Sequence, residues 1–409
     1  MFELNEQHRM VAQMVRKWCE AKLVPLIPAL EAGEAQPFDL MRELARTFGL
    51  DHLARAGLEK RIAKLRSGEA GAGEARESGT GMSDDPLMPF VLVKELSRIS
   101  PGFAMGWGVS VGLAGGAIAS RGTADQIERW GLPLVTTQKI GSWCLTEPGA
   151  GSDAFGSMQT TARPDPAAPG GWLLRGSKTF ITNGPGADLF VVYARLDRGE
   201  PRQEQTVASF VVERGMPGFS VGPPFKKMGM RDSPTSEIFF EDVALPAEHL
   251  LGGERGQGGR QATKENLAAE RSAVPAMAWG IIERCYEQSL RYARERVQFG
   301  RPIGEFQAVQ LKLADMFIKL INVENIVYRT AWMQQKKVSN PALINASKAY
   351  AAQMAVDVAM TAIQIHGGYG YMEELGLEKL ARDAKLLELG AGTTDINLLA
   401  AARAELARG

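Results

Sequence analysis

Two short segments carry hydroxyl, glycine and aromatic residues that could lie against a flat, polar-edged cofactor. The first is LTEPGAGSD and the second, further along the chain, is TFITNG. Pro148 fixes its own φ and the neighbouring glycines tolerate positive φ, so the first segment predicts a tight, exposed turn. Thr146, Ser152 and Thr182 supply hydrogen-bonding groups close to the backbone. An ordinary surface loop has the same turn residues, so the first segment alone leaves both interpretations open.

Two segments in the C-terminal part could contact phosphate. In RERVQFGRPIGEFQ, Arg296 precedes Phe299 and Gln307, and a guanidinium can bond two phosphate oxygens at once. In QIHGGYGY, Gly367 and Gly368 allow a phosphate or another surface to approach the backbone. A solvated arginine in an interhelical turn and a helix-ending glycine turn remain the structural alternatives.

The composition excludes several classes of protein. The chain has 409 residues, enough for two or three domains, and its 47 basic and 47 acidic residues give no net charge. Balanced charge disfavours binding to nucleic acid or to an anionic membrane. We find no run of about 18 apolar residues and no signal-peptide core, so we expect a cytoplasmic protein that binds no membrane.

The cysteines and histidines predict neither a metal centre nor a disulfide framework. Three cysteines and four histidines lie far apart in the sequence, without the spacing of metal ligands. Carboxylates, hydroxyls or a bound cofactor must therefore supply the chemistry.

The elements that must position these residues follow the order helices, strands, helices. Residues 67–85 are rich in Gly, Ser and Glu and predict a mobile surface loop. From about 140 to 245, short β-rich runs between turn residues are typical of a compact antiparallel β domain. Pro275 lies inside the helix expected over 260–296 and is expected to kink that helix. Helical periodicity is found at 3–30, 38–65, 87–99, 103–121, 260–296, 305–337, 341–366, 373–388 and 395–408.

This pattern predicts a mainly α protein with a central β domain. The expected domains are an N-terminal helical domain over 1–138, a middle β domain over 139–250 and a C-terminal helical bundle over 251–409. Arg382 and Asp383 are expected to form a structural ion pair, and Thr393 and Thr394 are suitable caps for the last helix.

Six ordered segments carry a resemblance to a known family. LTEPGAGSD, TFITNG, KKMGMRDSPTSEIFFEDV, RERVQFGRPIGEFQ, QIHGGYGY and RDAK resemble the acyl-CoA dehydrogenase family of flavoproteins from about residue 90 to 400. The resemblance implies an N-terminal helical domain, a middle β-barrel-like domain and a C-terminal four-helix bundle.

The resemblance also implies FAD, held partly by a neighbouring subunit. That arrangement implies a homotetramer built as a dimer of dimers, with a heteromer as an alternative. The implied FAD contacts on the flavin side are Leu145, Thr146, Gly151, Ser152, Phe180 and Thr182; those toward a neighbour's FAD are Arg296, Phe299, Gln307, Gln364, Gly367 and Gly368; and Thr393 and Asp395 return to the subunit's own FAD.

The usual catalytic base of this family is missing. Most members carry a Glu immediately before the Gly-Thr near the C-terminus, where this chain has Ala391. A minority, resembling isovaleryl- and long-chain-type enzymes, place it before an Arg on the helix that opens the C-terminal domain. Glu270 and Arg271 match that context, so we assign Glu270 as the base. The structural alternative is that Glu270 is a solvated glutamate on the helix surface. Burial against flavin and thioester should raise its pKa toward working pH.

Ala391 keeps its N–H, which the resemblance implies as the donor that polarises the thioester carbonyl. Ser152, Arg271 and Gly392 are the implied substrate contacts. Two departures leave the acyl-chain shape and the CoA contact open: Ala268 stands where the family has a carboxylate, and the loop 67–85 replaces a Gly-rich segment.

The implied reaction removes an α-proton from an acyl-CoA and transfers the β-hydrogen as hydride to flavin N5, which yields a trans-2-enoyl-CoA. Electrons would then pass to an electron-transfer flavoprotein. The alternatives are an oxidase, monooxygenase or desulfinase on the same fold, or a catalytically silent FAD subunit of a hetero-oligomer.

Overall fold

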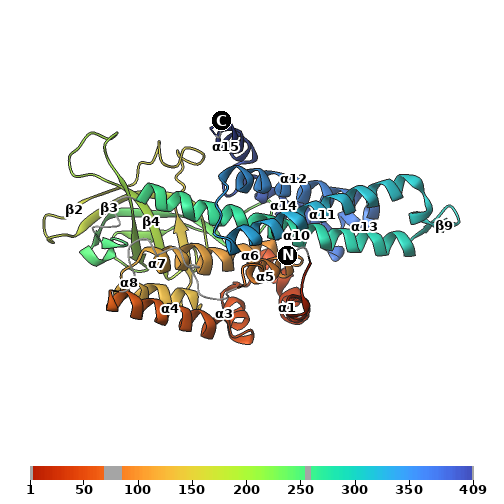
Figure 1. Cartoon of the computed structure of the whole chain (residues 1–409), viewed down its shortest axis with the longest axis horizontal. Coiled ribbons are helices and arrows are strands. Elements are labelled where there is room, and N and C mark those ends of the chain that lie inside the picture. The colour runs from red at the N-terminus through yellow and green to blue at the C-terminus, as the bar shows by residue number, and fades with distance from the viewer. Residues whose placement is uncertain (1–2, 69–84, 254–258, 408–409) are drawn as a thin grey trace.

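The computed structural model describes residues 3–68, 85–253 and 259–407, with side chains from 259 to 269 left out. Most of the expected loop at 67–85 therefore lies outside the described residues. Helices come first, a sheet follows and long helices complete the chain, as the sequence predicts (Figure 1).

The N-terminal helices differ from the sequence prediction mainly at their junctions. The stretch expected as one helix over 38–65 is two helices, because Gly49 adopts a φ of +64° between them, a conformation that favours glycine. The first helix continues after Trp18 into short π-helical and 3-10 turns before Pro28. The helices are α1 (Glu6–Trp18), α2 (Ile27–Ala32), α3 (Phe38–Thr47), α4 (Leu50–Ser67), α5 (Met88–Ser97), α6 (Pro101–Gly108), α7 (Gly116–Arg121), α8 (Ala124–Gln126) and α9 (Leu132–Val135).

The middle part of the chain forms one mixed sheet. Its order is β1-β4-β2-β3-β7-β6, with β5 also paired to β4. Both β1 and β2 pair with β4 in parallel, so the prediction of an antiparallel domain is wrong for these two pairings. Long connections between these strands permit parallel pairing. The strands are β1 (Gly141–Cys144), β2 (Thr161–Pro164), β3 (Trp172–Thr182), β4 (Leu189–Leu196), β5 (Val207–Glu213), β6 (Phe219–Val221) and β7 (Thr235–Leu245).

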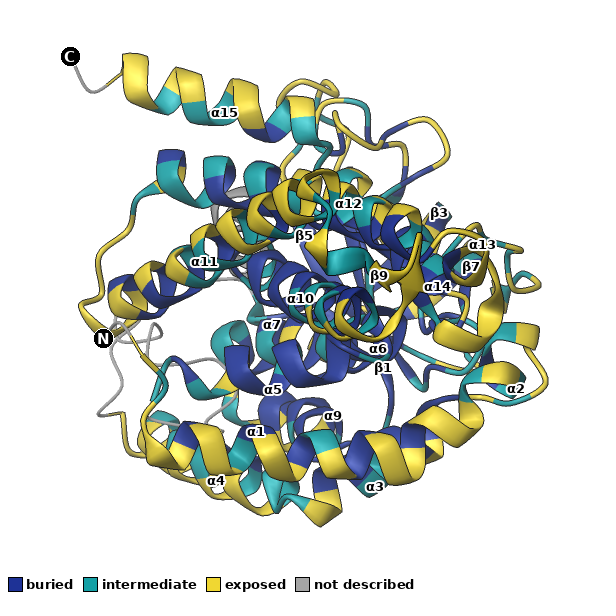
Figure 2. Cartoon of the chain, turned by 90° about the vertical axis from the view of Figure 1, so that its right-hand side faces the viewer, coloured by how far each residue is buried: buried dark blue, intermediate teal, exposed yellow. Residues whose placement is uncertain are grey.

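The C-terminal helices pack around α12, which contacts α10, α11, α14 and α15. Helix α15 lies along the outer side of this group (Figure 2), and α10 remains helical through Pro275. The elements are α10 (Gly259–Glu295), the hairpin β8 (Val297–Gln298) and β9 (Arg301–Pro302), α11 (Gln307–Gln335), α12 (Pro341–His366), α13 (Gly368–Tyr371), α14 (Leu377–Leu389) and α15 (Thr394–Leu406).

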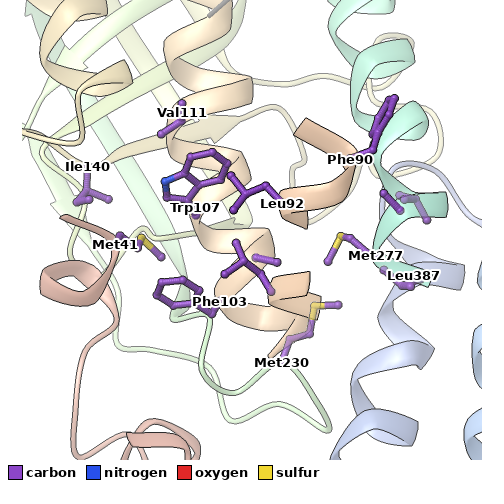
Figure 3. Packing of buried hydrophobic residues seen from close by; sticks show 14 of the residues in the cluster. Met41, Phe90, Leu92, Phe103, Trp107, Val111, Ile140, Met230, Met277 and Leu387 are labelled. Atoms are coloured by element: carbon purple, nitrogen blue, oxygen red, sulfur yellow. The ribbon is translucent and has the colours of Figure 1, made fainter. Parts of the chain in front are cut away.

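Side chains from all three parts share one core (Figure 3). Phe103 and Trp107 of α6 lie between Met41 of α3 and the C-terminal helices, where Met277 and Leu387 are buried. Because this core is continuous, the packing of α6 fixes where the sheet sits relative to α10 and α14.

One sequence expectation about an ion pair changes in the packed structure. Arg382 bonds Glu378, whereas Asp383 bonds Lys379 and the Met230 N–H, so the ion pair expected between Arg382 and Asp383 is not formed. Each side chain leaves α14 in a different direction and finds a different partner.

One segment of the described residues, Pro101–Arg121, is long and apolar enough to cross a membrane by length and composition. Its apolar window is 78% buried inside the protein. The segment is therefore explained as a core helix, and its apolar residues are those that the shared core requires.

Candidate active site

The segments LTEPGAGSD and TFITNG lie side by side. The Thr179 N–H donates to the Thr146 carbonyl at 2.9 Å, and the Ser142 hydroxyl donates to the Thr182 carbonyl at 2.8 Å. These bonds join β1 and the segment after it to the end of β3. Residues about thirty positions apart in sequence thus form one surface that carries hydroxyl groups.

A buried ion pair lies beneath this surface. The Lys178 ammonium donates to the Glu147 carboxylate at 2.7 Å and to the Leu145 carbonyl at 3.1 Å. Both Glu147 oxygens also accept backbone N–H groups, from Gln159 and Thr160. Burial lowers the pKa of Lys178 to about 8, while Glu147 acts to raise it.

Phe180 presents its ring to solvent between two buried neighbours. The pairing of β3 with β7 is irregular between Lys178 and Ile181, and Phe180 adopts a φ of +57° within that bulge. A bulge redirects the side chain at its centre, and 69% of Phe180 is exposed. A flat, open ring next to Thr182 suits contact with another flat ring. Gly151 and Ser152 lie exposed on the neighbouring turn, whereas Leu145 is buried.

A second cluster forms where α10 meets the turn between α14 and α15. The Arg271 guanidinium donates through Nε to the Ala391 carbonyl at 3.0 Å. From α12, the Lys348 ammonium donates to the Gly392 carbonyl at 2.6 Å. The structure therefore brings the Glu270–Arg271 pair against the turn whose side-chain carboxylate is absent.

Burial raises the pKa of the partly buried Glu270 to about 7. The positive charges of Arg271 and Lys348 oppose that rise, because they favour the ionised carboxylate. A carboxyl group with this pKa is divided between its acid and base forms near neutral pH, which suits proton transfer.

The turn at 391–393 has an unusual backbone for its sequence. Ala391 adopts a φ of +55° and Gly392 a φ of +85°, and a Cβ on Gly392 would lie 3.3 Å from the Arg271 guanidinium. Within the described residues, the Ala391 N–H donates no hydrogen bond to the protein. Thr393 caps α15, with its hydroxyl accepting from the Ile396 N–H, and Asp395 is exposed in the first turn of that helix.

A third group of predicted residues surrounds a pocket of about 490 Å³ at the far end of the helical bundle. Arg296, Gly367 and Gly368 line it, and the Arg296 guanidinium lies 5.8 Å from the centre of the Tyr369 ring. Gln364, Gln307 and Phe299 are exposed on the adjoining surface, and 93% of Phe299 is accessible.

Four polar residues of these clusters were not identified from the sequence. Each is a buried group that binds backbone carbonyls or backbone N–H groups, and such groups leave little periodic signal. A single Lys within the small apolar residues of α12 was the available clue for Lys348. The four residues are Glu147, Lys178, Lys348 and Asn397.

In the described part of the chain, no group of three or more His, Cys, Asp or Glu could hold a metal ion.

Models of the acyl-CoA dehydrogenase middle domain and C-terminal domain match residues 142–243 and 256–406. A short-chain-specific acyl-CoA dehydrogenase of Clostridium acetobutylicum is 32% identical over 400 residues, 97% of each chain. A mitochondrial isovaleryl-CoA dehydrogenase of Arabidopsis thaliana is 36% identical over 80% of this chain and 78% of its own.

Solved structures agree with these matches. Butyryl-CoA dehydrogenase from Megasphaera elsdenii superposes with a TM-score of 0.84 at 32% identity, over 99% of this chain and all of the other. An acyl-CoA dehydrogenase from Bacillus anthracis, solved with FAD, has a TM-score of 0.83 at 29% identity and covers 99% of this chain and 68% of its own.

The fold and the matches define a flavin-dependent oxidoreductase that acts on CH–CH bonds. The chain belongs to the acyl-CoA dehydrogenase family, and its cofactor is FAD. The groups present fit FAD. The exposed ring of Phe180 lies beside the hydroxyl of Thr182, and the guanidinium of Arg296 lines the pocket at the end of the bundle. The predictions of the family, fold class, activity and cofactor are confirmed, whereas the individual site residues and domain boundaries stay predictions.

Proposed function

We propose that this acyl-CoA dehydrogenase acts on a short-chain acyl-CoA and uses Glu270 as its base. The observation that carries the assignment is the contact of the Glu270–Arg271 segment with the turn at Ala391. Ala391 has no proton acceptor in its side chain, and Glu270 is the neighbouring carboxyl group with a pKa near 7. The short-chain substrate is supported by the names of the relatives at 32% identity.

Each residue of this cluster has a separate task in the proposal. Glu270 removes the α-proton, and the Ala391 N–H donates to the thioester oxygen as negative charge develops there. Arg271 holds the Ala391 carbonyl, and its remaining guanidinium nitrogens and Gly392 contact the CoA chain. When bound, FAD supplies the acceptor for the β-hydrogen as hydride.

The proposed FAD contacts follow the two other clusters. Thr146, Ser152 and Thr182 offer hydrogen-bonding groups at the flavin edge, and Phe180 offers an aromatic face. Leu145 and Gly151 complete the flavin side, while Thr393 and Asp395 approach the same FAD from the start of α15. This assignment rests on the bonds that join Thr146 and Thr182 to neighbouring strands.

The pocket near Arg296 is assigned to the FAD of a neighbouring subunit. Its aromatic and glycine lining is open to solvent, and exposed Phe299, Gln307 and Gln364 adjoin it. A homotetramer built as a dimer of dimers would cover these residues, and a hetero-oligomer is the alternative. An electron-transfer flavoprotein is the proposed acceptor, and the cytoplasm is the proposed compartment.

Anaerobic mixing of the purified holoenzyme with a panel of acyl-CoAs tests this proposal. Butyryl-CoA should bleach the oxidised flavin band rapidly, with slower bleaching by long-chain thioesters. An enzyme that bleaches only with long or branched chains contradicts the short-chain assignment. An enzyme that no thioester bleaches supports the silent-subunit alternative, and rapid reoxidation by air during turnover supports the oxidase alternative.

A further inference from the structure

Helix α12 carries a buried ammonium group that the proposed reaction does not use directly. Lys348 is fully buried, and an unpaired charge in that position would be strongly unfavourable. The Lys348 ammonium donates a hydrogen bond to the Gly392 carbonyl at 2.6 Å. The ammonium group is therefore held at the turn that begins with Ala391.

Donors from three helices bind three consecutive carbonyls of this turn. Arg271 of α10 binds the carbonyl of Ala391, and Lys348 of α12 binds that of Gly392. The Asn397 amide of α15 donates to the carbonyls of Gly392 and Thr393 at 2.7 and 2.9 Å. Asn397 is also fully buried, so its two bonds are shielded from water.

These bonds explain how a non-glycine residue keeps a left-handed backbone. A φ of +55° at Ala391 costs about 1–2 kcal/mol for an L-residue. The bonds hold the carbonyls of Ala391, Gly392 and Thr393 in fixed directions and so restrict backbone rotation at Ala391. The φ angle of Ala391 relates its N–H to these carbonyls, so the same bonds set the direction of the N–H. The Ala391 N–H itself has no partner in the described part of the chain, so the bonds hold it in place without occupying it.

We propose that Lys348 is a positioning residue: together with Asn397 it holds the turn 391–393 so that the Ala391 N–H points at the thioester oxygen. This inference rests on the proposed role of that N–H. A misplacement of about 1 Å can reduce a rate about a hundredfold, so the loss of either donor should weaken carbonyl polarisation. Besides holding the turn, Lys348 acts on Glu270 through its positive charge, which favours the ionised carboxylate.

Four variants separate this role from a structural one. Lys348→Met removes the ammonium group, and Asn397→Leu removes the amide donors while Lys348 remains. Lys60→Met is the control for loss of an ammonium group, because Lys60 is an exposed lysine on α4. Glu270→Gln removes the proposed base and leaves the turn intact.

Acetoacetyl-CoA is the probe, because it forms an enolate without giving a hydride to the flavin. Titration of each holoenzyme with this thioester gives the apparent pKa of the bound enolate from its absorbance. Lys348→Met and Asn397→Leu should raise that pKa by about one unit or more, a tenfold loss of enolate stabilisation. Flavin reduction by butyryl-CoA should slow about tenfold to a hundredfold in both.

The controls make the result decisive. Lys60→Met should match the wild type in both measurements, and Glu270→Gln should keep enolate ionisation while losing flavin reduction. If Lys348→Met has only a lower melting temperature, with wild-type ionisation and reduction, the proposal is wrong. If Lys348→Met does not bind FAD, Asn397→Leu decides by the same two measurements.

A wild type that ionises bound acetoacetyl-CoA but is not reduced by butyryl-CoA contradicts the proposed substrate and leaves the positioning role to the ionisation measurement. A wild-type enzyme that neither ionises bound acetoacetyl-CoA nor is reduced by butyryl-CoA overturns both the proposed function and the positioning role.

Discussion

In the proposed mechanism, single residues divide the work that one glutamate performs in most members of this family. Ala391 keeps the backbone N–H, and Glu270 on α10 offers the carboxylate. The sequence could predict this division because both positions lie in recognisable segments. It could not predict the bonds that hold the turn, since Lys348 and Asn397 reach backbone carbonyls that have no signature in a sequence.

The raised pKa of Glu270 predicts a pH-dependent stability difference. Its pKa moves from 4.5 to about 7 on folding, so the folded state binds more protons within this window. The stability that Glu270 contributes is present below about pH 4.5 and is lost as pH rises to about 7. Glu270→Gln should therefore be more stable than the wild type at pH 8, by at most about 3 kcal/mol.

Urea unfolding of both holoenzymes between pH 5.5 and 8 measures this difference. The difference in unfolding free energy between Glu270→Gln and the wild type should narrow as pH falls. Glu241→Gln, on the exposed face of β7, controls for the loss of a surface carboxylate. A gap that stays constant with pH would contradict the raised pKa.

At the scale of elements, the Lys178–Glu147 pair ties β3 to the segment after β1. Lys178→Met would leave Glu147 as an uncompensated buried charge, and breaking a buried pair costs about 3–5 kcal/mol. We expect that loss in thermal unfolding, together with easier release of FAD. Lys226→Met, at a nearby exposed position, should change neither property. Unchanged stability in Lys178→Met would show that the pair does not secure this surface.

The contact between α5 and α10 depends on a residue without a side chain. A Cβ at Gly280 would lie 2.2 Å from the Lys94 carbonyl, so Gly280→Ala must push the two helices apart. Overpacking of this kind costs about 1–3 kcal/mol. Gly116→Ala is the matched control in α7, because nothing lies within 4 Å of its added Cβ; it should stabilise by up to about 1 kcal/mol. Equal unfolding midpoints in urea for the two variants would contradict this packing.

Sequence patterns were sufficient to predict the long helices. They were insufficient where a single residue ends a helix or where contacts between distant segments decide the strand pairing. The helices α10 to α12 lie close to the ranges that the sequence predicts, but Gly49 divides into two helices a stretch that was expected as one. The parallel pairings of β4 with β1 and β2 depend on contacts between distant segments. Residue spacing alone carries no information about which edge of a strand a distant partner will join.

At the scale of the whole molecule, exposed aromatic residues at the end of the bundle predict assembly. Phe299 is 93% exposed and Tyr371 is 74% exposed, and together they would be unfavourable on a permanent surface. The wild type should sediment with four times the mass of the 44.3-kDa chain. Phe299→Asp should reduce that mass and weaken FAD binding.

Leu53→Asp is the control for this experiment, because Leu53 is an exposed apolar residue on α4, outside the proposed interface. Sedimentation should show the same mass for Leu53→Asp and the wild type. A monomeric wild type that retains FAD would exclude a cofactor shared between subunits.

The central claim is that Glu270 removes the α-proton, and anaerobic stopped-flow reduction by butyryl-CoA tests it most directly. Wild-type reduction should accelerate as pH rises through about 7, because the carboxylate form acts as the base. Glu270→Gln should bind FAD and butyryl-CoA normally and reduce its flavin about 10²–10⁴-fold more slowly, without that pH dependence. A variant that reduces flavin at the wild-type rate would place the base elsewhere.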